Sequence, residues 1–261
     1  MSKPEQDAAL RCQQLEQENA DLRTSLEMLR QDQEAGYHVQ KRLLPLNAME
    51  HQGFRLNYWL QPSLYLSGDF LDFWSPKPGK LLFYLADVSG HGASSAFVTI
   101  LLKYIVSRYA KEDDLSPARL CTRINEELLV GGLDKHLTLV MGCLDTQTRQ
   151  LTYTLGAHLP VPLMVSDGEV QELEGSGMPI GLFPGAVYKD YTCTFPEKGC
   201  LMMASDGVLE VLPGEGLEAR QKEWRLRVAA SGGDLESLLQ RLPGEPDNWP
   251  DDVTLMTVSG F

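Results

Sequence analysis

"LADVSGHGASSAFVTILLK", residues 85–103, joins an apolar run to an amphipathic helix through a short polar turn. The run that ends at Asp87 has the composition of a buried strand, and Gly90 and Gly92 separate it from the first helical residues. A carboxylate at the end of a buried strand is costly to remove from water unless a positive group meets it. The placement of Asp87 therefore indicates a charged site at the edge of a sheet.

Three other stretches place aspartates beside strand-like runs or tight turns. They are "LSGDFLDFW" (Asp69, Asp72), "ASDGVLE" (Asp206) and "WPDDVTLM" (Asp251, Asp252). Each alone is more typical of a turn, because Asp-Gly, Asp-Asp and Ser-Gly pairs are common turn sequences. Together with Asp87 they predict that one sheet edge gathers carboxylates from distant parts of the chain. Such carboxylates repel one another unless a divalent cation meets them, and an oxygen-rich site suits Mg²⁺ or Mn²⁺ better than zinc.

Around these motifs, the chain divides near Pro45 into a helical segment, 1–44, and a single strand-rich domain, 45–261. Strands are expected at 54–60, 80–88, 137–145, 150–157, 200–205 and 252–258. Two long helices interrupt them, one over residues 93–109 and one that begins near Ser116 and Pro117. The first should bury a stripe made of Ala93, Ala96, Phe97, Ile100, Leu101 and Tyr104, and the second one made of Leu120, Ile124 and Leu128. This order predicts an α+β layered architecture.

The N-terminal segment has the apolar spacing of a coiled coil. The d positions of its heptads are Leu15, Leu22 and Leu29, and the a positions are Cys12, Asn19 and Leu26. An asparagine at an a position favours two strands paired in register. Dimerisation through this helix is the preferred interpretation, and a solvated helix packed on its own domain is the alternative.

Composition excludes several classes of partner. The chain of 261 residues carries 36 acidic and 23 basic residues, and the net charge of −13 argues against unspecific binding to nucleic acid or to anionic membrane. Its five cysteines form no C-x-x-C motif, which fits a reducing cytoplasm. No apolar run reaches the roughly 18 residues of a membrane span, and the N-terminus lacks the apolar stretch of a signal peptide. We therefore expect a cytoplasmic protein.

Six motifs follow one another along residues 40–261. They are "SGDFLDFW", "LADVSGHGASSAFVTILLK", "GAHLPVPLM", "MPIGLF", "ASDGVLEV" and "DDVTLMTV". In this order and at these separations they resemble the bacterial PP2C-like (PPM-type) serine/threonine phosphatases of the SpoIIE/RsbU class. The resemblance implies an αββα sandwich, in which two antiparallel sheets face each other, helices cover the outside and a two-metal site lies at one edge between the sheets.

The resemblance also implies two ions, Mn²⁺ or Mg²⁺, and names their ligands. Asp69 would bind one ion, Asp87 would bridge both, Asp206 and Asp251 would bind the other, and the backbone carbonyl of Val88 would add a further contact. Asp252 is the second choice beside Asp251. Asp87 is then also the catalytic residue, because it would hold the attacking water between the ions.

Two positions depart from the pattern of the class. Val88 stands where the wider family often has glycine, and Leu159 stands where an asparagine often follows the histidine of the "GAHLP" motif. The first departure puts the carbonyl contact in doubt, and the second removes a polar group near the site. Neither one removes a carboxylate ligand.

The remaining candidates have alternative interpretations. His91 is either a general acid or a residue that forms a structural hydrogen bond in its turn. Ser89 and His91 are not expected to form a hydrolase pair, because no G-x-S-x-G motif surrounds the serine. His158 is expected to form hydrogen bonds at the rim of the site, and Asp72 to support the ligands or to lie in a plain turn. The other histidines, His38, His51 and His136, show no zinc-site spacing.

The resemblance implies a metal-dependent phosphatase that acts on a phosphorylated regulatory protein, an anti-sigma-factor antagonist of the STAS type. Members of the class commonly carry a receiver or sensor domain before such a helix, so the chain is expected to be the output part of a signalling protein. Two other classes compete with this interpretation. A catalytically inactive adaptor would lack the ligand aspartates, which are all present here, and a coiled-coil scaffold would leave the aspartates unexplained.

Overall fold

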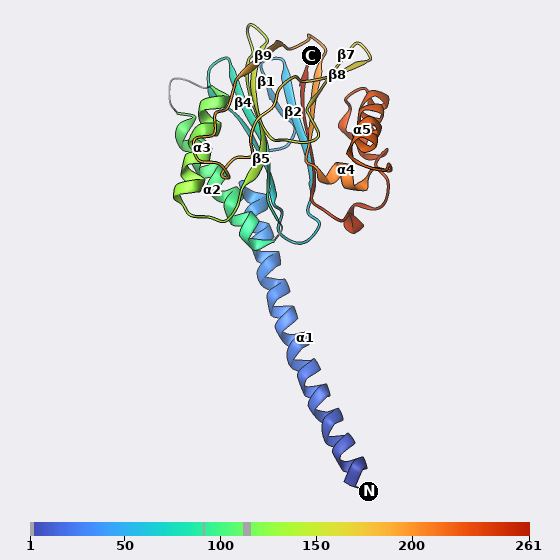
Figure 1. Ribbon diagram of the computed structural model, residues 1–261. Coiled ribbons are helices and arrows are strands. Elements are labelled where there is room, and N and C mark those ends of the chain that lie inside the picture. Colours follow the sequence, from blue (N-terminus) through green and yellow to red (C-terminus); the bar gives the residue numbers. More distant parts are fainter. Residues whose placement is uncertain (1–2, 91, 112–115) are drawn as a thin grey trace.

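Figure 1 shows the computed structural model, a sandwich of two β-sheets with a long helix that projects from one end. The structure describes residues 3–90, 92–111 and 116–261. One sheet contains, in spatial order, β1 (Met49–His51), β2 (Phe54–Gln61), β11 (Val253–Gly260), β10 (Cys200–Ala204), β7 (Leu163–Ser166) and β8 (Glu169–Glu172). The other contains β3 (Asp69–Lys77), β4 (Lys80–Val88), β5 (Leu137–Asp145), β6 (Gln150–Gly156) and β9 (Tyr191–Thr194). All neighbouring strands are antiparallel.

Helices cover both outer faces of the sandwich (Figure 1). They are α1 (Lys3–Leu43), α2 (Ala93–Tyr109), α3 (Pro117–Val130), α4 (Gly207–Val211), α5 (Leu217–Ser231) and α6 (Leu235–Leu239), with a 3₁₀ turn at Pro246–Asn248. α2 and α3 lie on the five-stranded sheet, and α4 to α6 lie on the six-stranded sheet. The expected αββα sandwich with a long N-terminal helix is thus confirmed.

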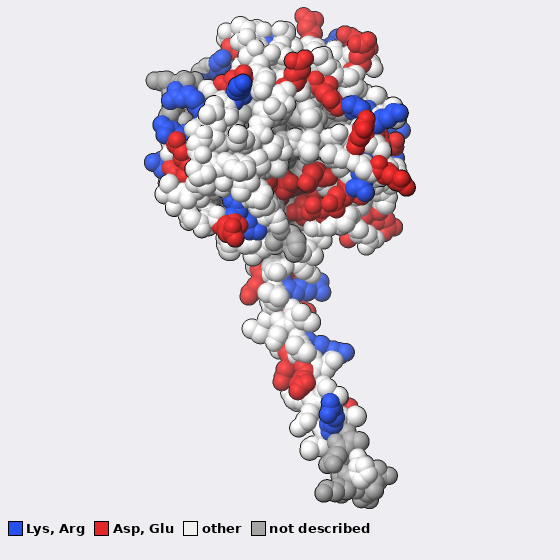
Figure 2. Space-filling model, viewed as in Figure 1, with Lys and Arg blue, Asp and Glu red and all other residues white. Residues whose placement is uncertain are grey.

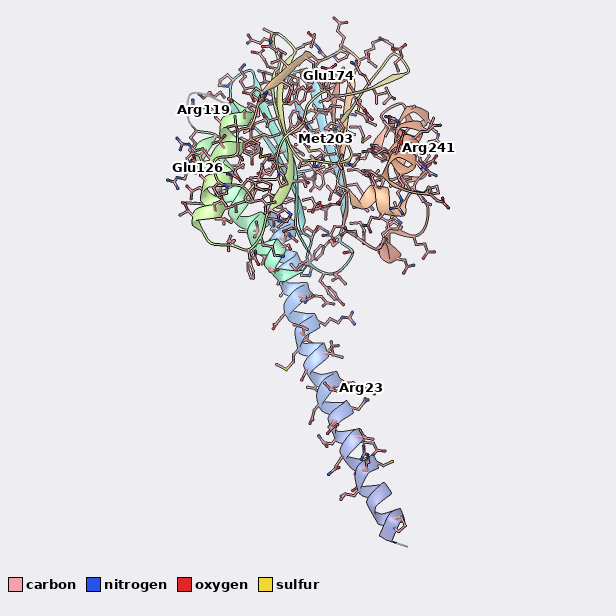
Figure 3. The ribbon with its side chains drawn as sticks, in the orientation of Figure 1. Arg23, Arg119, Glu126, Glu174, Met203 and Arg241 are labelled. Carbon is pink, nitrogen blue, oxygen red and sulfur yellow. The ribbon has the colours of Figure 1, made fainter. Side chains whose placement is uncertain are left out.

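The alternation of side chains along β4 explains how the strand leads to a charged site. Leu81, Phe83 and Leu85 point into the layer between the sheets, whereas the residues between them pack under α2 and α3. Met203 of β10 faces the same inner layer from the other sheet, as Figure 3 shows inside the sandwich. With a period of two residues, Asp87 is the next inward-pointing position. It therefore lies at the end of the apolar layer.

α2 and α3 occupy the expected ranges, but the buried face of α2 differs from the prediction. Val98, Leu102 and Ile105 are buried against the sheet, whereas Phe97 is 70% exposed and Tyr104 is 64% exposed. α2 carries apolar residues on more than one side, so its periodicity does not select a single face. Hydrogen bonds of the buried Ser95 and Thr99 side chains fix the rotation of the helix instead. For α3, the Ser116 cap and the buried Leu120, Ile124 and Leu128 agree with the prediction.

The 41-residue helix α1 changes character along its length. Its N-terminal part projects into solvent, and Arg23 lies on this free part in Figure 3. Near its C-terminal end, Gln40 is buried, donates to the Ser67 carbonyl at 2.7 Å and to Thr99 Oγ1 at 3.1 Å, and accepts the Ser67 N–H at 3.1 Å. The last turns of α1 are therefore part of the domain. Among the described helices, none is both long enough and apolar enough to cross a membrane.

Candidate metal centre

Two of the predicted ligands face each other across the first strand pair of the five-stranded sheet. Asp69 opens β3 and lies opposite Asp87 near the end of β4. Thr254 of β11, in the other sheet, donates its hydroxyl to Asp69 Oδ2 at 2.7 Å. Asp69 is 1% exposed, and burial, followed by the charges of Asp87 and Asp252, raises its pKa well above the usual range. A carboxylate of this kind is stabilised by any positive charge that reaches it.

A cavity of about 270 Å³ opens at this end of the sandwich. Its walls are formed by Asp87, Val88, Ser89, Gly90, His136, Thr138, Asp206, Asp251 and Asp252. Asp87 comes from β4 of the five-stranded sheet, whereas Asp206 follows β10 and Asp251 precedes β11 of the six-stranded sheet, so both sheets contribute acids. Figure 2 shows this hollow, in which acidic side chains gather beside α4. The structure thus brings Asp87, Asp206 and Asp251 together, as the sequence predicts.

The acids around the cavity oppose one another's ionisation. Burial, followed by the charges of Asp206 and Asp251 and a hydrogen bond with Asp206, raises the pKa of Asp87 to about 8. Burial, and the nearby charge of Asp206, also raises the pKa of Asp251. Within the described ranges, no three carboxylate, imidazole or thiol groups already stand at metal-ligand spacing. Cations would have to draw these side chains together, and would relieve their repulsion.

Asp251 and Asp252 have different environments although they are consecutive. Asp252 is 6% exposed, and its carboxylate accepts four hydrogen bonds, from the N–H and hydroxyl of Ser63, the hydroxyl of Ser67 and the N–H of Gly68, at 2.7–2.9 Å. Asp251 accepts the N–H of Asp252 at 2.8 Å and is half-buried in the cavity wall. The carboxylate of Asp252 is therefore committed to the 63–68 segment, and that of Asp251 is the more available for a ligand.

Several residues that support the acids escaped the sequence prediction. Ser67 donates its hydroxyl to Asp252 Oδ2 at 2.9 Å and accepts the N–H of Asp69 at 3.0 Å. Through its backbone, Ser67 also holds Gln40 of α1. Ser67 stands in the quoted motif "SGDFLDFW", and Gln40 lies five residues before Pro45, but nothing in the sequence shows that they bind each other. The helix end and two of the acids thus share one hydrogen-bond network.

The loop that follows Asp87 is held by a lysine. Lys135 Nζ donates to the Ser89 carbonyl at 2.7 Å and to Ser95 Oγ at 3.2 Å, and Ser95 Oγ donates to the Gly90 carbonyl at 2.9 Å. The hydroxyl of Ser89 accepts the N–H of His136 at 3.2 Å, a structural contact rather than that of a nucleophile. The two interpretations of His91 concern a residue that lies outside the described ranges.

His158 contacts a residue of the cavity wall, whereas Asp72 lies away from the cavity. His158 is buried behind Thr138, with Nδ1 3.4 Å from Thr138 Oγ1, and its Nε2 has no hydrogen-bond partner among the described residues. Burial lowers its pKa to about 4, so the ring is neutral at pH 7. Asp72 faces α2 and forms an ion pair with Lys103. It is neither a turn residue nor a neighbour of the cavity.

Comparison with known proteins identifies relatives of the chain. The sequence model of the family described as Stage II sporulation protein E (SpoIIE) matches residues 77–260. Protein IcfG of Synechocystis sp. is 23% identical over an alignment of 260 positions that covers 86% of this chain and 41% of that protein. Phosphoserine phosphatase RsbP of Bacillus subtilis is 24% identical over 161 residues, 60% of this chain and 40% of that protein. The chain thus spans about two fifths of the length of either relative.

Among solved structures, the SiaA-PP2C domain of Pseudomonas aeruginosa matches with a TM-score of 0.72 and 19% identity. The match covers 91% of this chain and 98% of that domain. At this level of identity, the likeness concerns the fold.

Proposed function

The chain belongs to the SpoIIE family, and from this premise we propose that it is a metal-dependent phosphatase that removes phosphate from serine or threonine of a regulatory protein. The observation that carries the proposal is the cavity where Asp87, Asp206 and Asp251 converge from both sheets, and where burial, followed by the charges of Asp206 and Asp251, raises the pKa of Asp87 to about 8. A group of acids in this state is suited to cations. The name of the relative RsbP, a phosphoserine phosphatase, supports the same reaction class.

Two Mn²⁺ or Mg²⁺ ions fit the chemistry of these donors, which are all oxygen atoms. The proposed ligands are Asp69 for one ion, Asp87 for both, Asp206 and Asp251 for the other, and the carbonyl of Val88. When bound, the ions supply positive charge that holds a phosphate group and lowers the pKa of water. Asp252 is not included, because four hydrogen bonds already engage its carboxylate.

The surrounding residues would keep the ligands in place during turnover. Thr254 fixes Asp69 across the two sheets, and Asp252 ties β11 to the segment before β3. Lys135 holds the carbonyl of Ser89, one residue after Val88, and so restrains the backbone next to the proposed carbonyl ligand. Each contact places a side chain or carbonyl of the centre without touching the substrate, so these residues are positioning residues.

The substrate class follows from the family resemblance. We propose a phosphorylated STAS-type regulatory protein, delivered by a signalling pathway in which a receiver or sensor domain controls the phosphatase. A reducing cytoplasm suits the free cysteines, of which Cys121, Cys143 and Cys200 are buried. Burial raises the pKa of each of these three thiols, which keeps them unreactive.

Hydrolysis of para-nitrophenyl phosphate and of a phosphoserine peptide, with Mn²⁺, with Mg²⁺ and with a chelator, tests this function. We expect turnover with either metal, loss of turnover in chelator and recovery when Mn²⁺ is added in excess. Equal turnover in chelator would contradict the metal requirement.

A protein-binding adaptor is the second candidate function. It is favoured by one observation, that no three ligand groups among the described residues already stand at metal-ligand spacing. An adaptor would bind a phosphoserine peptide with and without Mn²⁺ and would release no phosphate. The hydrolysis assay therefore separates the two candidates.

We further propose that α1 pairs with a second copy of the chain. Leu15, Leu22 and Leu29, the predicted d positions, are 55–64% exposed along one side of the helix, so the apolar seam has no cover within the described chain. Leu22→Asp places a charge in this seam and is expected to convert a dimer to a monomer at tens of micromolar. Thr24→Asp, two residues away on the outer side of the heptad, is the control and should leave the dimer intact.

Sedimentation velocity distinguishes these results. A monomeric parent protein, or a Leu22→Asp variant that stays dimeric, would contradict pairing through α1.

A further inference from the structure

Four exposed apolar side chains, those of Leu159, Met178, Leu182 and Phe183, lie on segments next to the wall of the acidic cavity, and we call them the platform. We propose that this platform binds the segment of the substrate protein next to its phosphorylated residue, and that it selects segments with apolar side chains. The inference rests on the proposed phosphatase function and names the part of the substrate that the site would recognise.

The platform is set in an unusually uncharged stretch of surface. Residues 175–188, "GSGMPIGLFPGAVY", contain no charged side chain, although 23% of the residues in the chain are charged. Within this stretch Met178, Leu182 and Phe183 are 43–49% exposed, and Leu159 is 36% exposed. Single exposed apolar side chains are ordinary, but four around one uncharged segment are typical of a contact surface.

The backbone under the platform is firmly held. Ile180 exchanges two hydrogen bonds of 2.9 Å with Leu137. Asn125 of α3 accepts the N–H of Gly181 at 2.8 Å and donates to the carbonyl of Phe183 at 3.1 Å. The segment therefore presents its apolar side chains from a fixed position, which reduces the entropy that a partner must overcome on binding.

The same contacts place the platform next to the cavity. Leu137 opens β5, and its neighbours His136 and Thr138 form part of the cavity wall. Thr138 lies opposite Asp87 across β4 and β5, and Ile180 lies along the other edge of β5. Strands are spaced about 4.8 Å apart, so the platform segment begins one strand beyond the cavity wall. In Figure 2 an uncharged area lies between the acidic hollow and helices α2 and α3.

Leu159 extends the platform from the adjoining loop. It follows His158, whose ring lies behind Thr138, and Ala157 bridges to Leu139 of β5. Leu159 occupies the position where the SpoIIE/RsbU class often has asparagine, so this part of the apolar surface is a property of the present chain.

Charge decides which side of the cavity a phosphorylated segment would cover. The exposed Glu210 of α4 lies near Asp251 and keeps this side of the cavity acidic, so it would repel an acidic flank of the substrate. The platform carries no charge and gains from covering its apolar side chains. A segment with leucine, methionine or phenylalanine beside the phosphoserine is therefore the occupant that fits.

Two phosphoserine peptides of equal length and charge test the proposal, one with leucine and phenylalanine flanks and one with serine and asparagine flanks. We expect the parent protein with Mn²⁺ to show about a tenfold lower KM for the apolar peptide. The Leu182→Ser/Phe183→Ser variant should lose this preference and keep its turnover of para-nitrophenyl phosphate. Leu226→Ser, at a position 57% exposed on α5, is the matched control and should keep the preference.

Fluorescence anisotropy with labelled peptides in chelator measures the same preference without turnover. A parent protein that hydrolyses para-nitrophenyl phosphate and treats both peptides alike overturns the platform and leaves the phosphatase function standing. Absence of all turnover overturns the function, and the anisotropy difference then still decides the platform. A dimer that the double variant dissociates would mean that a second copy covers this surface, which overturns the proposal. If the double variant melts at a much lower temperature than the parent protein, Met178→Ser is used instead. This single variant should likewise lose the preference for the apolar peptide.

Discussion

Replacement of Asp87 by asparagine is expected to reduce Mn²⁺-dependent hydrolysis of para-nitrophenyl phosphate by roughly 10³-fold. Asp87 lies in the cavity wall with Asp206 and Asp251, and burial, followed by the charges of these two acids, raises its pKa. Asparagine keeps the shape of the side chain but removes the charge that would hold both cations. Steady-state kinetics with saturating Mn²⁺ measure the loss, and a variant that retains a tenth of the turnover would contradict the bridging role.

The same variant should be more stable than the parent protein when metal is absent. In the folded chain the pKa of Asp87 is about 8, whereas an unfolded aspartate titrates near 4. The stability that Asp87 contributes is therefore complete below about pH 4 and is lost as the pH rises towards 8. Asparagine does not titrate, so the variant should melt higher at pH 8, by about 2–4 °C for each kcal/mol recovered, and similarly to the parent at pH 4.

Thermal melts in chelator at both pH values measure this difference. Equal melting temperatures of parent and variant at pH 8 would show that the folded protein does not disfavour the charged form of Asp87.

Asparagine substitutions at the consecutive positions 251 and 252 are expected to affect different properties, stability at position 252 and turnover at position 251. Asp252→Asn replaces one acceptor oxygen with an amide among four donors, and should cost about 2–4 kcal/mol of folding free energy. Asp251→Asn disturbs a single described hydrogen bond, should leave the melting temperature in chelator unchanged or slightly raised, and should lower Mn²⁺-dependent turnover by about 10²-fold.

Each variant serves as the control of the other, because both remove one negative charge from the same end of the sandwich. Melting temperature in chelator, the Mn²⁺-induced rise in melting temperature and turnover are measured together. If Asp252→Asn folds normally and loses the metal response, Asp252 is the ligand and the assignment to Asp251 is wrong.

The parts of the fold that the sequence predicts are those with a strong local signal. The alternation of β4, the break at Asp87 and the Ser116–Pro117 cap of α3 each depend on neighbouring residues. The local pattern does not predict β3 as a strand, because Asp69 and Asp72 are typical of turns. In the structure Thr254 donates a hydrogen bond to Asp69, and Lys103 pairs with Asp72. Such partners are distant in the sequence, and local patterns do not reveal them.

Local sequence patterns are also weak for some helices on the outer faces of the sandwich. α5 buries only a few apolar side chains, among them Trp224 and Val228, within a charged segment, so its pattern is weak. For the site, the motifs indicate which acids gather, but not which of two consecutive aspartates is committed to the 63–68 segment. That distinction arises from the different directions in which neighbouring side chains leave the backbone at the start of β11.

The position of β11 determines when, during synthesis, the acids of the cavity can come together. This strand, late in the chain, lies between β2 and β10, and its Thr254 reaches Asp69 across 185 positions of sequence. Until it inserts, the six-stranded sheet is split in two, and the acids of residues 206 and 251 have no fixed relation to those of 69 and 87. A nascent chain on the ribosome would therefore acquire the proposed cation site only after this region has emerged, and shorter products of translation would lack it.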